Sequence, residues 1–169
     1  WQHSGPSNAA RASKIQKPRH YAEVFINDTK DPTTILTYGM GYGQTRHSGL
    51  RGINLDNIGR LRPEWTYSLS DTRGQETFPL IHDGKMYVTT HASTMALDLV
   101  TGRQIWKTLV DYPADTPRVA CCGIVNRAVA LYEGKVFRTT LDAHVSRWAL
   151  RPAMNYGGRN PLITRPDIR

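Results

Sequence analysis

Short runs of alternating apolar and polar residues, separated by tight turns, dominate the middle of the chain. An Asp-Gly pair at positions 83–84 precedes residues 85–90, which alternate in the way expected of a strand that leaves a hairpin turn. Further strands are predicted over residues 65–69, 94–98 and 104–107, and a short helical turn over residues 53–58. The pattern therefore predicts a fold built from β-hairpins.

The hairpin pattern occurs twice. Residues 83–90 align without gaps with residues 133–140, and 133 − 83 gives a spacing of 50 residues. In the same alignment Met95 falls opposite Val145. Short strands repeated at this spacing are typical of β-propeller blades, each of which buries a face against its neighbour. The alternative is two unrelated hairpins with similar turns, and the match over eight consecutive positions argues against it.

Composition and charge exclude several classes of protein. The chain has 169 residues, of which 39% are hydrophobic, and no apolar run approaches the ~18 residues of a membrane span. The net charge of +8 is concentrated at residues 11–20 and 147–169, without any nucleic-acid recognition motif, so nucleic-acid binding is not expected. Residues 1–20 are predicted to be a disordered basic lead. No signal peptide is visible, so either the chain is not exported or its signal is missing from this sequence.

The two cysteines of the chain are adjacent, at Cys121 and Cys122. Adjacent Cα atoms lie about 3.8 Å apart, below the usual disulfide range of roughly 4.4–6.8 Å, so a bond between them would form a strained ring. Strain of this kind gathers at ligand sites. The alternative is a pair of buried free cysteines on opposite faces of a strand, and the pair alone favours that alternative.

Several motifs together resemble the dehydrogenases that use pyrroloquinoline quinone (PQQ). Residues 96–106 follow the pattern Ala-Leu-Asp-x2-Thr-Gly-x3-Trp, which is similar to the tryptophan-docking motif of these quinoproteins. The methanol and ethanol dehydrogenase branch is matched further by Leu-Thr-Tyr-Gly at 36–39, Ile-Asn at 53–54, Leu-Arg-Pro-x-Trp at 61–65, Asp-Gly-Lys-Met-Tyr at 83–87 and Cys-Cys-x2-Val-Asn-Arg at 121–127. The docking motif also occurs in non-catalytic propellers, whereas the cysteine motif in this context is specific. The resemblance runs from about residue 22 to residue 145.

The resemblance implies an all-β fold, part of an eight-bladed β-propeller with one to two blades in residues 21–145 and disordered ends. PQQ is a flat ortho-quinone with three carboxylates, and the family places a vicinal disulfide against one of its faces. Cys121 and Cys122 match that disulfide, Arg127 matches an arginine that holds a cofactor carboxylate, and Glu76 matches a glutamate at the polar edge of the cofactor. Taken alone, Arg127 could be a surface ion-pair residue and Glu76 a solvated loop carboxylate.

The same resemblance assigns structural roles to the docking motif. Trp106 is expected to pack one blade against the next, and Gly102 to form the turn that precedes it. Two further residues complete the motif, Ala96 and Asp98.

The resemblance also implies chemistry that this chain does not complete. In the family a Ca²⁺ or lanthanide ion held by a Glu and an Asn polarises the quinone, and an Asp acts as general base. Nothing in this chain matches those residues, so catalytic and metal-binding residues are both predicted to be absent. The implied parent enzyme is periplasmic, oxidises small primary alcohols and passes electrons to cytochrome c or a membrane quinone. This chain alone is expected to be inactive. The alternative function is a non-catalytic PQQ-like repeat propeller that acts as a protein-interaction scaffold.

The second copy of the repeat loses the family pattern after Val145. Residues 146–169 lack a docking motif in the frame as written. A shifted codon reading of residues 152–157 permits Gly-x-Glu-Leu-Trp, 50 residues after the corresponding segment at 102–106. The hypothesis is that residues 146–169 are a frameshifted tail outside the family.

Overall fold

The computed structural model describes residues 25–149, apart from residues 27, 29, 121 and 122. The predicted lead at residues 1–20 lies outside this range, and so do residues 150–169 of the tail predicted over residues 146–169. The described part of the chain contains no helix long and apolar enough to cross a membrane.

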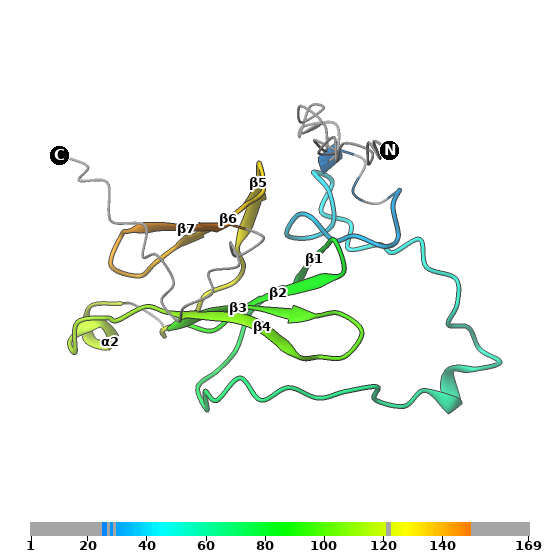
Figure 1. Ribbon diagram of the computed structural model, residues 1–169, viewed down its shortest axis with the longest axis horizontal. Coiled ribbons are helices and arrows are strands. Elements are labelled where there is room, and N and C mark those ends of the chain that lie inside the picture. The colour runs from blue at the N-terminus through cyan, green and yellow to red at the C-terminus, as the bar shows by residue number, and fades with distance from the viewer. Residues whose placement is uncertain (1–24, 27, 29, 121–122, 150–169) are drawn as a thin grey trace, which may run out of the picture.

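In the part of the chain that the structure describes, seven strands form two antiparallel sheets (Figure 1). The first sheet has the order β1-β2-β3-β4 and consists of β1 (Leu80–His82), β2 (Lys85–Thr89), β3 (Ser93–Asp98) and β4 (Gln104–Leu109). The second sheet has the order β5-β6-β7 and consists of β5 (Ala130–Tyr132), β6 (Lys135–Thr139) and β7 (Val145–Ala149). Two short helices have defined bounds within the described residues, η1 (Ile58–Arg60) and α2 (Thr116–Val119). The all-β prediction is confirmed, and η1 begins at Ile58, the last residue of the segment predicted as a helical turn.

The predicted repeat is visible in the backbone of the two hairpins. Strand β1 pairs with β2 through His82 and Lys85, and β5 pairs with β6 through the residues 50 positions later, Tyr132 and Lys135. Each hairpin turns through two residues with positive φ: 50° and 68° at residues 83–84, and 44° and 69° at residues 133–134. Positive φ at both turn positions matches the twist of the flanking strands, which explains the glycine in each copy.

The gapless alignment between the two copies holds only through the first hairpin. The β2–β3 loop closes with a hydrogen bond from Thr90 N to Ser93 O, whereas the β6–β7 loop closes from Thr140 N to His144 O and is one residue longer. Strand β2 therefore pairs Thr89 with Thr94, but β6 pairs its equivalent residue with Val145. The predicted equivalence of Met95 and Val145 is wrong by one residue, because the extra loop residue displaces β7.

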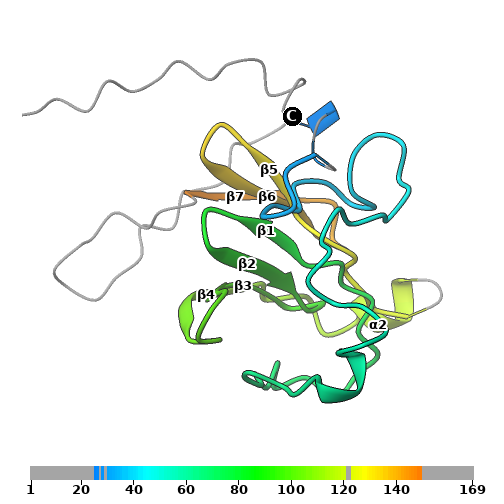
Figure 2. The same ribbon diagram turned by 90° about the vertical axis from the view of Figure 1, so that its right-hand side faces the viewer.

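The two sheets stack face to face, and the main hydrophobic core lies between them (Figure 2). The first sheet contributes Leu80, Tyr87, Ala96 and Trp106, and the second sheet contributes Leu131 and Val136. Trp106 lies in the middle of this layer, with ring centroids 6.3 Å from Tyr87 and 6.5 Å from Trp148 on β7. Each sheet thus buries one face against its neighbour, as in adjacent propeller blades.

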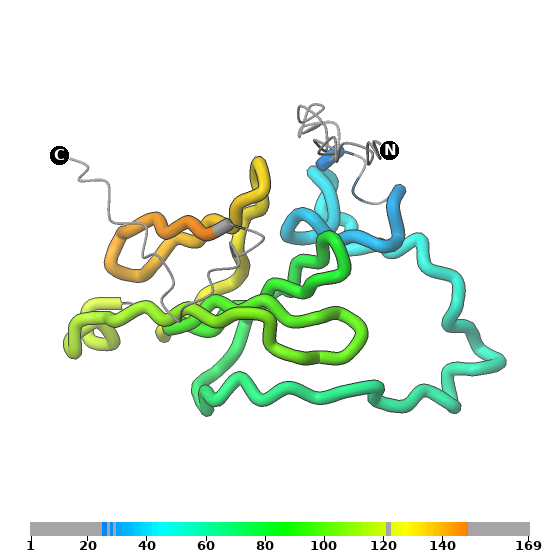
Figure 3. The backbone as a smooth tube through the Cα atoms, in the orientation of Figure 1, coloured from blue at the N-terminus to red at the C-terminus, as the bar shows by residue number. Residues whose placement is uncertain are grey.

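The strand predicted at residues 65–69 is not formed. This segment runs beneath β4 without a strand partner (Figure 3). The alternation of apolar and polar residues in this segment still has a structural role. Its apolar residues Trp65, Tyr67 and Leu69 pack on the outer face of the first sheet. There they contact a second buried cluster, which consists of Val88, Met95 and Leu97. The prediction was wrong for the backbone because a strand requires a hydrogen-bonded neighbour, which a sequence pattern cannot supply.

Candidate functional site

Two loops bring the predicted cofactor residues Glu76 and Arg127 together. Glu76 precedes β1 and Arg127 precedes β5, so the two residues lie in equivalent loops, each leading into the first strand of a sheet. Phe78 N donates a hydrogen bond of 2.6 Å to Arg127 O, which holds the two loops side by side. Arg127 Nη2 lies 2.8 Å from Glu76 Oε2, with 65% and 47% of the two side chains exposed. The pair is therefore formed and still open to a ligand.

Threonine and asparagine side chains anchor the same two loops. Thr77 Oγ1 and Thr89 Oγ1 lie 2.9 Å apart, and the Thr89 hydroxyl also donates to Asn126 O at 3.4 Å. Asn126 Nδ2 donates to Thr139 O at 3.1 Å. Among the described residues, its buried Oδ1 has no hydrogen-bond partner. These bonds tie the residues next to Glu76 and Arg127 to strands β2 and β6. The sequence signalled this network only through the Val-Asn-Arg motif.

The predictions for Cys121 and Cys122 lie outside the described residues. The structure describes what surrounds them in the chain: helix α2 ends at Val119, and Gly123 follows with φ of 109°. A positive φ of this size favours glycine, which explains the residue type directly after the cysteine pair.

The docking motif forms the β3–β4 turn. Asp98 Oδ1 accepts hydrogen bonds from the backbone N–H and the hydroxyl of Thr101, both at 2.8 Å. Gly102 has φ of 69°, and a Cβ at this position would lie 2.5 Å from the indole of Trp65. The turn therefore needs glycine for two reasons, its backbone conformation and the close approach of an aromatic ring. Ala96, fully buried on β3, faces Trp106 on β4.

A cluster that sequence reasoning missed lies at the β2–β3 loop. Asp71 Oδ1 lies 2.9 Å from Arg73 Nε, and Asp71 Oδ2 lies 2.8 Å from His91 Nδ1. The hydrogen bond from Arg73, together with that from His91, holds the pKa of Asp71 well below its usual range. The ring of His91 stacks on Tyr112 with centroids 6.2 Å apart. No spacing in the sequence predicts this cluster, because Asp71 and His91 lie in different loops.

The same loop is held from beneath by Arg138 of β6, whose side chain is 1% exposed. Its guanidinium donates to Thr94 Oγ1 at 3.0 Å, to Thr90 O at 2.9 Å and to His91 O. Burial lowers the pKa of Arg138, and the Coulombic interaction with Tyr112, together with a hydrogen bond to it, opposes that effect. Arg138 thus connects the second sheet to the β2–β3 loop and to the start of the β4–β5 connection.

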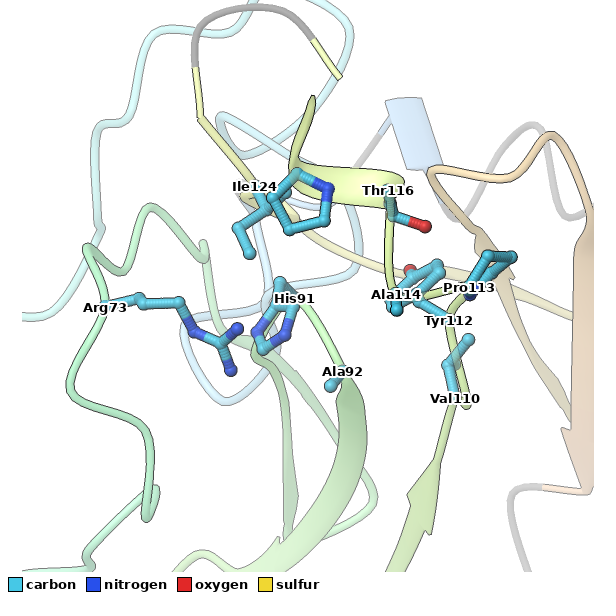
Figure 4. Close-up of a pocket in the computed structure, with 10 residues that line it drawn as sticks. Arg73, His91, Ala92, Val110, Tyr112, Pro113, Ala114, Thr116 and Ile124 are labelled. Atoms are coloured by element: carbon cyan, nitrogen blue, oxygen red, sulfur yellow. The ribbon is translucent and has the colours of Figure 1, made fainter. Parts of the chain in front are cut away.

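A cavity of about 240 Å³ opens beside His91 (Figure 4). Arg73 lines it from the loop before β1, Val110 from the end of β4, and Ile124 from the segment that follows the cysteine pair. In the described part of the chain, histidine, cysteine and acidic side chains do not gather into groups of three that could hold a metal ion.

Comparison with known proteins places the chain in a family. The family model of the glucose/ethanol/alcohol dehydrogenase β-propeller domain, a PQQ family, matches residues 36–148. The chain is 41% identical over 124 residues to the 1-butanol dehydrogenase (quinone) of Thauera butanivorans, covering 72% of this chain and 20% of that protein. It is 43% identical over 126 residues to the quinoprotein ethanol dehydrogenase of Pseudomonas aeruginosa, covering 73% and 20%.

Solved structures agree with the sequence relatives. A europium-containing methanol dehydrogenase superposes with a TM-score of 0.68 at 33% identity, over 75% of this chain and 23% of that one. The quinohemoprotein alcohol dehydrogenase of Comamonas testosteroni superposes with a TM-score of 0.63 at 38% identity, over 68% and 17%. These matches confirm the predicted partial propeller and its resemblance to quinoprotein alcohol dehydrogenases. The chain, which spans about a fifth of the length of the curated relatives it matches, belongs to the PQQ-dependent glucose/ethanol/alcohol dehydrogenase β-propeller family.

Proposed function

We propose that this chain supplies one edge and one face of the cofactor site in a PQQ-dependent alcohol dehydrogenase. The observation that carries the proposal is the pairing of Arg127 with Glu76, two residues that lie 51 positions apart in the sequence (127 − 76) and meet at 2.8 Å. Relatives named as 1-butanol, ethanol and other alcohol dehydrogenases support the same reaction class.

The residues present fit a ligand with carboxylates on a flat ring. The guanidinium of Arg127 is planar, always charged and able to bind a carboxylate through two parallel N–H groups. Glu76 holds that guanidinium in place and offers acceptor oxygens to donors on the ligand edge. Both side chains remain about half exposed or more, so a ligand can reach them. When bound, PQQ accepts the hydride of the alcohol; the part of this chain is to bind and orient the cofactor.

Cys121 and Cys122 would form the adjacent face as a vicinal disulfide. A disulfide bond between Cys121 and Cys122 would persist in an oxidising compartment such as the periplasm, which is where we place the whole enzyme. A Ca²⁺ or lanthanide ion would be held by residues outside this chain. One structural neighbour is a europium-containing methanol dehydrogenase, which is in keeping with a lanthanide.

The electron acceptor would be cytochrome c or a quinone. The names of two dehydrogenases from Thauera butanivorans specify one acceptor each, quinone in the first and cytochrome c in the second. The chain by itself would be inactive, because it spans about a fifth of such enzymes. A scaffold without catalysis is the weaker alternative, since the matched relatives carry enzyme names.

A chimera tests the proposal directly. Residues 36–145 of this chain would replace the matching segment of the Pseudomonas aeruginosa quinoprotein ethanol dehydrogenase, and PQQ affinity and ethanol oxidation would be measured. We expect the chimera to bind PQQ and oxidise ethanol. Arg127→Met should weaken PQQ binding at least tenfold, since a hydrogen bond to a charged group contributes about 1.5–3 kcal/mol.

Arg103→Met is the matched control, because Arg103 is an exposed arginine of the β3–β4 turn. It should leave PQQ affinity unchanged. A folded chimera that binds no PQQ, or equal affinity of the two arginine variants, would overturn the proposal.

A further inference from the structure

Asn126, the residue before Arg127, bonds equivalent positions of the two sheets. Its backbone O accepts a hydrogen bond from the Thr89 hydroxyl at 3.4 Å, and its side-chain Nδ2 donates to Thr139 O at 3.1 Å. Thr89 is the last residue of β2 and Thr139 is the last residue of β6, 50 positions later in the repeat (139 − 89). Asn126 is therefore attached to both sheets, and Arg127 starts from a fixed point between them.

The hydrogen bonds on the first sheet continue to the residue beside Glu76. Thr77 Oγ1 accepts from Thr89 N at 3.2 Å, and the two hydroxyls lie 2.9 Å apart. Because the Thr89 hydroxyl gives its one proton to Asn126 O, the Thr77 hydroxyl donates to Thr89 Oγ1. Thr89, which is 1% exposed, thus joins the chain neighbours of both members of the ion pair.

The contact with Thr139 determines how the Asn126 amide is oriented. A backbone carbonyl only accepts, so the amide nitrogen faces Thr139 O, and Oδ1 lies on the other side of the amide. Oδ1 is buried, without a hydrogen-bond partner among the described residues. A buried acceptor without a donor costs at least as much free energy as one hydrogen bond contributes. The amide therefore adds little net stability, and its effect is on the position of the loop.

Arg127 depends on this loop for the placement of its side chain. Its Nη2 lies 2.8 Å from Glu76 Oε2, and its backbone O accepts from Phe78 N at 2.6 Å. Both contacts lead to the loop before β1, whereas Asn126 adds the attachment to the second sheet. An exposed arginine loses conformational entropy when it binds a ligand, so a backbone that is fixed beforehand lowers the cost of binding.

We propose that Asn126 is a positioning residue, which holds the Arg127 loop between the two sheets so that the guanidinium meets a cofactor carboxylate in a fixed place. The inference rests on the cofactor role proposed for Arg127. Asn126 acts through Arg127 and is assigned no contact with PQQ of its own.

Backbone NMR of the 169-residue chain tests the attachment without any cofactor. In Asn126→Leu, a side chain of similar size without the donor, the ¹⁵N order parameter of the Arg127 amide should fall from the rigid range, about 0.85, toward the flexible range, below about 0.6. The matched control is Asn57→Leu, which should leave that order parameter unchanged. The Asn57 amide also bonds at both ends, to Asn54 N at 2.9 Å and Gly52 O at 2.8 Å, but within its own short loop. A rigid Arg127 amide in Asn126→Leu would overturn the proposal.

A double-mutant cycle in the chimera with the Pseudomonas aeruginosa dehydrogenase tests the effect on the ligand. Asn126→Leu should weaken PQQ binding about threefold or more, with little change in the urea midpoint of unfolding. In the Arg127→Met background the same substitution should have no further effect, because a positioning residue acts only through the residue that it positions. An equal loss in both backgrounds would refute the proposal. If Arg127→Met itself keeps the full PQQ affinity, the cofactor role of Arg127 fails instead, and the order parameters still decide whether Asn126 holds the loop.

Two substitutions of Thr89 provide a further check. Thr89→Val removes the hydroxyl that reaches Asn126 O and keeps the shape of the side chain, whereas Thr89→Ser keeps the hydroxyl. We expect Thr89→Val to weaken PQQ binding in the same direction as Asn126→Leu, and Thr89→Ser to stay within about twofold of wild type. Equal affinities of the two Thr89 variants would contradict the role of these hydrogen bonds.

Discussion

Arg127 and Glu76 meet at 2.8 Å across two loops, although each was assigned to the cofactor from a separate motif. Their pairing gives the loops a shared charged edge at the end of both sheets. Because both side chains are widely exposed, the pair gains little from Coulomb attraction in water. In the proposed cofactor site, the Glu76 carboxylate holds the Arg127 guanidinium where a ligand carboxylate can meet it.

Removing this ion pair should scarcely change the stability of the chain. Glu76→Gln and Arg127→Met are each expected to lower the free energy of unfolding by less than about 1 kcal/mol, the usual value of an exposed pair. Urea denaturation followed by tryptophan fluorescence measures the effect. A loss of several kcal/mol would mean that the pair holds the fold together, and would weaken its assignment to a ligand.

Gly102→Ala should be severely destabilising. The new Cβ would lie 2.5 Å from the Trp65 ring and would displace an indole whose Nε1 donates to Leu99 O at 3.1 Å. We expect a loss of about 3 kcal/mol or more in urea denaturation.

Gly134→Ala separates the two causes of that loss. Gly134 has the same φ of 69°, but a Cβ there meets nothing within 4 Å. The backbone conformation alone should cost about 1–2 kcal/mol. Equal losses at Gly102 and Gly134 would show that contact with Trp65 is unimportant.

Arg138→Met should cost roughly 3 kcal/mol, since it leaves the Thr94 hydroxyl and two backbone carbonyls buried without their donor. Arg147→Met, on the exposed side of β7, is the control and should stay within about 0.5 kcal/mol of wild type. Hydrogen exchange of the β2–β3 loop amides should quicken only in the Arg138 variant. An Arg138 variant as stable as the control would show that the buried bonds contribute nothing net.

Acid should remove the stabilisation that Asp71 provides. Its pKa in the folded chain lies below the ordinary value of 3.8, so the folded state favours the ionised carboxylate beside Arg73 and His91. A carboxylate whose pKa is lower in the folded state stabilises the fold at a pH above its pKa in the unfolded chain. This stabilisation is lost progressively as the pH falls toward the pKa in the folded state. The stability difference between wild type and Asp71→Asn should therefore shrink from about pH 5 to about pH 3. Urea denaturation across this range measures it, and a constant difference would contradict the assignment.

Local patterns were sufficient to predict hairpins but not the pairing of separate segments. The Asp-Gly and Glu-Gly turns predicted both β-hairpins. A two-residue hairpin turn of this type needs positive φ at both positions, and few residue pairs other than those ending in glycine adopt it. The alternation at residues 65–69 correctly separated its packed side chains from its exposed ones. It could not show that this segment has no hydrogen-bonded neighbour, which depends on where other strands lie.

For the candidate site, motif resemblance selected Glu76 and Arg127, whereas the Asp71–His91 pair and buried Arg138 carried no recognisable signal. Each of those contacts joins residues from different loops or sheets, and no periodicity records such distances. The sequence by itself determined the turns, the repeat and the residue types of the proposed cofactor edge, since these depend on neighbours along the chain. Only the tertiary structure decided the register of β7, the stacking of the sheets and the cavity beside His91. Those features depend on how separate segments pack against one another.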